Sequence, residues 1–187
     1  MVLGETLTYL NESAIDSANP QHEYYHVELS DGKLAWARSY GIALNAYPAA
    51  IINQTPIYKR PDLVTKTDKS FNIAEFVAVV NEKEQWVEVI GAEKRKTGWI
   101  KNESISTDNE DIAVATLAQK DLLDKEGKII MDKLSTFLES LPGGNSSLAR
   151  YLQDQMSNQV EGAIEESIEE YEATSDEGEY TEEGAIN

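Results

Sequence analysis

An internal repeat in the first 106 residues constrains the fold more than any other feature of this sequence. Each copy has an aromatic residue, a valine three positions later, a tryptophan, and an isoleucine six positions after the tryptophan. These positions are Tyr24, Val27, Trp36 and Ile42 in the first copy and Trp86, Val89, Trp99 and Ile105 in the second. The intervals differ by one residue only, between the valine and the tryptophan. A repeat of about 62 residues predicts two copies of one small domain.

Both copies have the pattern of β-strands. Tyr25 and Val27 are apolar positions in an alternating run, as on a strand with one buried face. Asp31 and Gly32 follow this run and signal a hairpin turn, because Asp-Gly supplies the positive φ angles that such turns require. The other predicted strands are at 7–10, 34–37, 50–52, 57–58, 75–80, 85–90 and 98–100. Residues 1 to about 106 are therefore expected to be mainly β.

The motif inside the repeat is an aromatic-x-x-Val strand, a variable hairpin, and a Gly-Trp or Ala-Trp pair before a short closing segment. It reads Trp86-Val87-Glu88-Val89 and Gly98-Trp99-Ile100 in the second copy, and Tyr24-Tyr25-His26-Val27 and Ala35-Trp36-Ala37 in the first. This motif resembles that of tandem bacterial SH3-like domains, with Ala35 in place of the usual glycine. The resemblance covers about residues 3–106. It implies two small barrels, with residues 1–45 in the first domain and residues 46–107 in the second.

The first copy is shorter than the second. The counterpart of the segment from Ile51 to Tyr58 would fall before Met1. We therefore expect a truncated first barrel, either partly open or completed by other chain segments, and native residues ahead of Met1. An export or lipoprotein signal among such residues would fit the extracytoplasmic bacterial setting that the resemblance implies.

After about residue 108 the apolar spacing changes from that of strands to that of helices. One stripe contains Val114, Leu117, Ala118 and Leu122, and the next contains Ile130, Leu134, Phe137, Leu138 and Leu141. Gly127 lies between the two stripes and favours a break into two helices. The acidic residues at 108–111 are expected to cap the first helix, because they lack the oxygen spacing of a calcium loop.

A further helix is expected after the Pro-Gly-Gly stop at 142–144, with Asn145 or Ser146 as its cap. Its apolar stripe contains Leu148, Leu152, Met156, Val160, Ile164 and Ile168. The regular four-residue step predicts a face that is buried against something. This face either packs on the preceding helix as a hairpin or binds a partner protein. Residues 108–173 form the predicted helical hairpin region.

Charge limits the partners that the chain can bind. The sequence has 34 acidic and 16 basic residues, a formal net charge of −18. This balance argues against nucleic acid and anionic lipid, because binding to phosphates needs basic surface. No apolar run approaches the roughly 18 residues of a transmembrane helix. Arg150 is the last basic residue, and we predict an acidic, disordered tail at 174–187 that docks a basic protein partner.

Aromatic residues are the candidates for ligand contacts in the β region. The resemblance implies an aromatic groove between loops as the binding face. We assign Tyr47, Tyr58, Trp99 and Tyr24 to this face. Tyr47 and Tyr58 lie beside prolines in a loop-rich stretch. The competing interpretation is that the aromatics fill the barrel cores, and it is the one we expect to hold for Trp36 and Trp86.

Catalysis, metals and cofactors find little support in the residue types present. His22 and His26 are the only histidines, fewer than a metal site needs. The chain has no cysteine, no glycine-rich phosphate loop and no Gly-x-Ser-x-Gly motif. We therefore expect no bound metal or cofactor and no enzymatic activity.

Three hypotheses for function follow from these observations. The first is a non-enzymatic binding or scaffold module of the bacterial cell envelope, periplasmic or surface-exposed, with SH3-like domains that recognise a peptide, a cell-wall glycan or a protein. The second is an assembly subunit whose C-terminal helices and acidic tail dock a partner. The third is the targeting region of a larger envelope enzyme.

Overall fold

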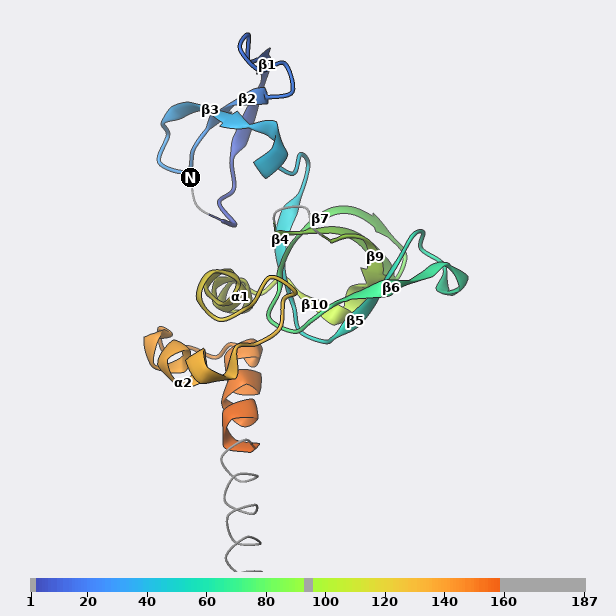
Figure 1. Cartoon of the computed structure of the whole chain (residues 1–187), viewed down its shortest axis with the longest axis vertical. Coiled ribbons are helices and arrows are strands. Elements are labelled where there is room, and N and C mark those ends of the chain that lie inside the picture. Colours follow the sequence, from blue (N-terminus) through green and yellow to red (C-terminus); the bar gives the residue numbers. More distant parts are fainter. Residues whose placement is uncertain (1–2, 93–95, 159–187) are drawn as a thin grey trace, which may run out of the picture.

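The computed structural model describes residues 3–92 and 96–158 of the chain. These residues are mainly β, in two sheets, with three helices in the C-terminal part (Figure 1). The first sheet is three-stranded and consists of β1 (Thr8–Ile15), β2 (Glu23–Glu28) and β3 (Leu34–Arg38), in that order. The short helix η1 (Ser39–Gly41) follows β3. The coarse prediction of a mainly β N-terminal part with helices after it is therefore confirmed.

The second sheet is seven-stranded and curves round into a ring (Figure 1). Its strands are β4 (Tyr47–Ile51), β5 (Thr55–Tyr58), β6 (Lys66–Phe71), β7 (Phe76–Lys83), β8 (Trp86–Gly91), β9 (Thr97–Lys101) and β10 (Ile105–Ser106). They are arranged in the order β10-β4-β7-β8-β9-β5-β6, and every pairing is antiparallel. Two short helices, η2 (Leu63–Thr65) and η4 (Asn102–Ser104), lie in the connections.

Alternating apolar residues fill the ring. Val77 and Val79 of β7 point inward together with Val87 and Val89 of β8, and all four are buried. This is the result expected for strands with one buried face. The remaining buried members of this core are Ala49, Ile51, Ile57, Phe71 and Ile100.

The three-stranded sheet repeats the geometry of β7, β8 and β9. The β2–β3 ladder and the β8–β9 ladder each contain five residue pairs in the same relative register. Corresponding pairs are His26–Trp36 with Glu88–Trp99, and Val27–Ala35 with Val89–Gly98. Trp36 and Trp99 therefore hold equivalent positions, so the intervals seen in the sequence reflect matching ladders.

The match extends to both ends of the ladder. β1 shifts register after the pair Tyr9–Val27, and β7 shifts after the pair Val79–Val89. A short helix follows β3 as another follows β9, and in each case an extended isoleucine closes it, Ile42 or Ile105. Within the described residues, the three-stranded sheet has no counterpart of β4, β5 and β6.

Gly98 and Ala35 show how the two sheets differ. Gly98 has φ +145°, and a Cβ atom there would lie 2.5 Å from Cγ2 of Ile57 and 2.8 Å from the carbonyl oxygen of Tyr58. β5 therefore passes too close to this backbone for any side chain. At the equivalent position of the three-stranded sheet no such strand lies alongside β3, and Ala35 is accommodated.

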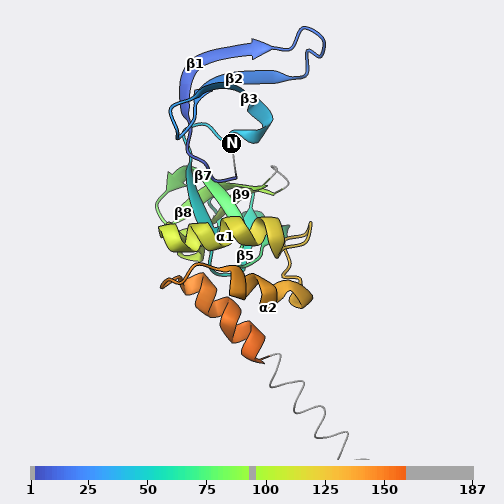
Figure 2. The same ribbon diagram turned by 90° about the vertical axis from the view of Figure 1, so that its left-hand side faces the viewer.

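The helices form layers beside the ring. α1 (Asn109–Asp121) lies across one face of the seven-stranded sheet, and α2 (Met131–Ser140) and a third helix, residues 147–158, lie beyond it (Figure 2). Gly127 has φ +79° in the turn between α1 and α2, where Leu123 and Ile129 form an isolated bridge. The predicted break at this glycine is confirmed. Among the described helices, none is long and apolar enough to cross a membrane.

Two aspartates cap two different helices. Asp108 accepts hydrogen bonds from the backbone of Glu110 and Asp111 and caps α1, as expected. Asp111 instead reaches the third helix: its Oδ1 accepts from Oγ of Ser146 at 2.7 Å and from the backbone N–H of Leu148 at 3.0 Å. Ser146 also accepts from the N–H of Ala149. The prediction that residue 145 or 146 caps this helix is thus confirmed.

The apolar stripe of the third helix begins inside the chain's own core. Leu148 and Leu152 are fully buried against α1 and α2, and Met156 packs partly against the same cluster. This part of the stripe does not form a free face for a partner, because α1 and α2 already cover it. Val160, Ile164 and Ile168 and the predicted acidic tail at 174–187 lie outside the described residues.

An ion pair between the partly buried Lys96 and the buried Glu75 joins the ring to the helices. Nζ of Lys96 lies 2.5 Å from Oε1 of Glu75 and donates to the carbonyl of Glu126 in the turn before α2. Burial raises the pKa of Glu75, opposed by hydrogen bonds from the Asn72 N–H and from Lys96. The pair therefore connects three loops that are distant in sequence.

Candidate functional site

A cavity of about 700 Å³ lies between the three-stranded sheet and the seven-stranded sheet. Its walls come from the segment before β1, from β1 and β2, from the linker at 40–46, and from the near ends of β4, β7 and β8. A volume of this size is within the range of ligand pockets, about 300–1,000 Å³, and pockets often form where two units meet.

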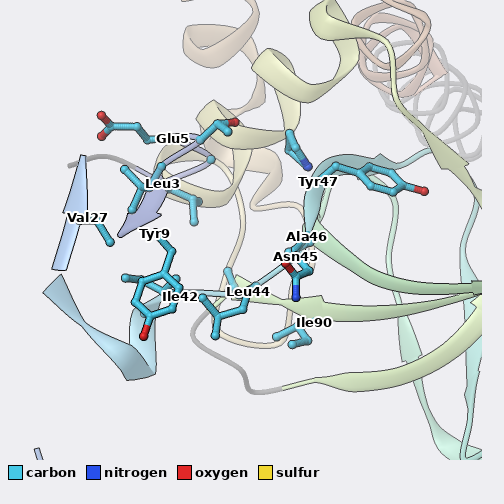
Figure 3. A pocket seen from close by; sticks show the side chains of 18 of the residues that line it. Leu3, Glu5, Tyr9, Val27, Ile42, Leu44, Asn45, Ala46, Tyr47 and Ile90 are labelled. Carbon is cyan, nitrogen blue, oxygen red and sulfur yellow. The ribbon is translucent and has the colours of Figure 1, made fainter. Parts of the chain in front are cut away.

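The lining of the cavity is mostly apolar. Figure 3 shows Tyr9, Ile42 and Leu44 turned toward one another, with Ile90 across from them. Val27 forms part of the wall from β2 and is fully buried. Further apolar residues that line it are Leu3, Leu7, Pro48, Phe76 and Ala78.

Polar groups lie at the edges of the cavity. Glu5 accepts a hydrogen bond from Oγ of Ser30 at 2.8 Å. Asn11 and Asn45 also line it, and both have left-handed backbone conformations, with φ +61° and +52°. Asparagine tolerates this region better than most residues. The cavity therefore combines an apolar interior with amide and carboxylate groups at its margin.

Of the four aromatic residues assigned to ligand contacts, Tyr47 lines this cavity. Its ring turns away from the apolar group in Figure 3, and its hydroxyl donates to Oε1 of Glu82 at 2.7 Å. Loss of hydration and the Glu82 carboxylate raise the pKa of Tyr47 to about 12. The Tyr47 hydroxyl is therefore a neutral donor at physiological pH.

The other three lie elsewhere. Tyr58 is only 7% exposed and packs edge-on against Trp86, with ring centroids 4.9 Å apart. Trp99 pairs with Tyr58 across β9 and β5 and is partly buried. Tyr24 is partly buried on β2, three residues before Val27, so it lies on the opposite face of the strand from the one β2 residue that lines the cavity. These three residues do not form a common groove with Tyr47.

Trp36 and Trp86 differ, although both were expected in cores. Trp86 is buried, and Nζ of Lys101 lies 4.0 Å from its ring centroid. Trp36 is 50% exposed and stacks on the ring of His26 at 4.7 Å, and His26 in turn contacts Glu12 at 2.7 Å. The expectation for Trp36 was wrong because β3 is an edge strand in the described structure, with no neighbour beside it like the β5 strand beside β9.

Sequence reasoning missed most of the cavity. Tyr9, Ile42 and Leu44 belong to segments that carry no binding motif, and they converge only through the fold. The available signal was the repeat: it matches β2 and β3 to β8 and β9, and within the described residues the three-stranded sheet has no counterpart of β4.

Within residues 3–92 and 96–158, no group of three or more histidine or acidic side chains is placed to hold a metal ion. Comparison of the chain with protein-family models, with curated proteins and with solved structures finds no match.

Proposed function

We propose that the chain is a non-enzymatic binding module built from two copies of an SH3-like β unit, one complete and one open. The strand order β10-β4-β7-β8-β9-β5-β6 supports this assignment for residues 47–106. β4 and β10, the first and last strands of this unit along the chain, pair with each other, as the terminal strands of a small barrel do. The matching β2–β3 and β8–β9 ladders support it for the three-stranded sheet.

The observation that carries the proposal is the cavity between the units. It is large, mainly apolar and bordered by polar groups, the combination typical of binding pockets. We propose that this cavity holds an apolar part of a peptide, a protein segment or a cell-wall fragment. The resemblance to bacterial SH3-like domains supports a role in the cell envelope, where such modules attach proteins to wall peptides or to other proteins.

A titration followed by nuclear magnetic resonance tests the proposal. The full chain, labelled with ¹⁵N, is titrated with soluble muropeptides and, separately, with short apolar peptides. We expect saturable shifts of the amides at 42–47, which line the cavity, with at least one of these ligand sets.

Two variants make the result specific. Leu44→Asp places a charge in the cavity wall, whereas Leu63→Asp places the same charge on the exposed hairpin between β5 and β6. The shifts should disappear in Leu44→Asp and persist in Leu63→Asp. No binding by either ligand set, or shifts that Leu44→Asp leaves unchanged, would refute the proposed function.

A further inference from the structure

We propose that the cavity is a slot for one added β-strand from a partner polypeptide, which would occupy the place that β4 has in the seven-stranded sheet. This inference rests on the proposed function and specifies the ligand of the same cavity. It is argued from the second unit, which shows the same arrangement with the slot filled.

In the seven-stranded sheet, β4 lies between β7 and β10. Tyr47 and Ala49 pair with Val79 and Val77 of β7, and Ile51 pairs with Ile105 of β10. β4 is thus hydrogen-bonded on both sides. One neighbour is β7, the first strand of the β7–β8–β9 ladder, and the other is β10, which follows that ladder in the chain.

The matched ladders place the equivalent elements around the cavity. β1 corresponds to β7 because Tyr9 pairs with Val27 as Val79 pairs with Val89. Ile42 corresponds to Ile105, since each closes the short helix after the ladder. β1 is an edge strand that pairs only with β2 in the described structure. Its free edge and the segment from Ile42 therefore correspond to the two neighbours of β4.

The cavity lies between these two elements. Leu7 and Tyr9 line it from the β1 side, Ile42 and Leu44 line it from the other side, and Val27 contributes from β2. Val27 is the counterpart of Val89, a core residue of the ring. Val27 itself is already fully buried, whereas Tyr9 and Ile42 are only partly buried. A strand placed here would direct alternate side chains between Tyr9 and Ile42, as β4 directs Ala49 and Ile51 into the core of the ring.

Ala35 limits the addition to one strand. In the seven-stranded sheet, β5 approaches β9 so closely that a Cβ atom at Gly98 would overlap Ile57 and Tyr58. The Cβ atom of Ala35, at the equivalent position on β3, blocks the same approach. The partner therefore adds a strand like β4 beside β1 and no strand like β5 beside β3.

Charge adds a second property of the partner. Residues 3–45 contain six acidic residues (Glu5, Glu12, Asp16, Glu23, Glu28 and Asp31) and two basic ones (Lys33 and Arg38). Glu5 lines the cavity, and Glu28 pairs with Thr8 of β1. The fitting partner is thus an extended segment with apolar residues at alternate positions and basic residues at its ends, since opposite charges favour encounter. Strand addition of this kind uses main-chain hydrogen bonds for affinity.

The test uses a synthetic peptide with the sequence of β4 and its flanks: residues 46–53 of this chain with two lysines added at each end. Two control peptides carry N-methyl groups, one at the positions of Ala49 and Ile51 and the other at those of Ala50 and Ile52. Each control keeps every side chain and removes the N–H donors of one strand edge. Binding to the full chain is measured by calorimetry, and amide hydrogen exchange locates the site.

We expect one peptide to bind per chain, with new protection at 6–9 and 42–44 and weaker binding at high salt. Each N-methylated control should bind about thirtyfold more weakly, because two hydrogen bonds of about 1 kcal/mol each are lost. Leu44→Asp should abolish binding and Leu63→Asp should not.

Three outcomes would overturn the inference. Equal binding of the N-methylated controls would show apolar burial without strand pairing. Protection located on the seven-stranded sheet would show that the peptide displaces β4. Failure of the peptide, while another ligand still binds the cavity, would refute the strand slot and leave the proposed function standing; failure of every ligand would refute both.

Discussion

The contrast between Gly98 and Ala35 makes a quantitative prediction, because the two residues hold equivalent positions in matched ladders. In Gly98→Ala the new Cβ atom would lie 2.5 Å from Cγ2 of Ile57 and 2.8 Å from the Tyr58 carbonyl oxygen. Relief of this overlap requires a shift of β5, which costs about 1–3 kcal/mol. The φ angle of +145° adds roughly 1–3 kcal/mol for any residue with a side chain.

We therefore expect Gly98→Ala to lower the free energy of unfolding by roughly 2–6 kcal/mol, the sum of these two costs. The reciprocal change, Ala35→Gly, removes a methyl group from a strand with no neighbour on that side. It should cost only about 0.5–1 kcal/mol, the entropy penalty of glycine in a strand.

Urea denaturation followed by circular dichroism measures both variants against the unmodified chain. Tryptophan fluorescence adds a second probe, since Trp86 and Trp99 report on the seven-stranded sheet and Trp36 on the other. Equal costs for the two variants, or a cost for Gly98→Ala below about 1 kcal/mol, would refute the argument that β5 closes one unit and leaves the other open.

Three further predictions concern the contacts between the ring and the helices. Asp111→Ala removes the carboxylate that accepts from the Leu148 N–H and from the Ser146 and Ser147 hydroxyls at the start of the third helix, and should cost roughly 2–4 kcal/mol at neutral pH. Burial alone would raise the pKa of Asp111, but hydrogen bonds from the Leu148 N–H and from serine hydroxyls hold it below the ordinary value. Its contribution is therefore complete above the ordinary pKa of an aspartate and is lost as the pH falls toward the lower folded value, so the two unfolding curves should converge in acid. Lys96→Met leaves the Glu75 carboxyl buried without its lysine partner. Because burial raises the pKa of Glu75, stability should fall as the pH rises from the ordinary pKa of a glutamate to the raised folded value, by up to about 1.4 kcal/mol per pH unit. Unfolding measured at several pH values checks the slope. Leu152→Ala should cost about 2–5 kcal/mol by thermal or urea unfolding, as at other fully buried leucines, whereas a partner-facing leucine would cost far less.

The strands that carry the repeat could be predicted because local pattern and tertiary structure agree there. Tyr25 and Val27 alternate, and Asp31 and Gly32 lie in the turn between β2 and β3. Of these two turn residues, Gly32 has the predicted positive φ angle and Asp31 does not. The helix break at Gly127 was predicted for the same reason. β6 was missed because Lys66–Phe71 is largely polar and its place in the sheet comes from pairing with β5.

Contacts between distant segments could not be predicted from spacing. The acids at 108–111 were expected to cap one helix, yet Asp111 caps another that begins more than thirty residues later. Lys96 ends the basic run Lys94-Arg95-Lys96 of the sequence, a composition typical of a solvated loop, and only the fold brings Lys96 to Glu75. The cavity is the same kind of feature, since its walls come from five separate strands and a linker.

The central claim is that the three-stranded sheet is an open copy of the unit that the seven-stranded sheet completes. Nuclear Overhauser contacts between strands test it most directly. The claim predicts cross-strand contacts between Trp36 and His26 and between Trp99 and Glu88 in the same register, with no further strand from residues 3–92 and 96–158 in contact with residues 6–9 on their free edge. A one-residue slip of β3 against β2, or a strand of this chain already seated on that edge, would contradict it.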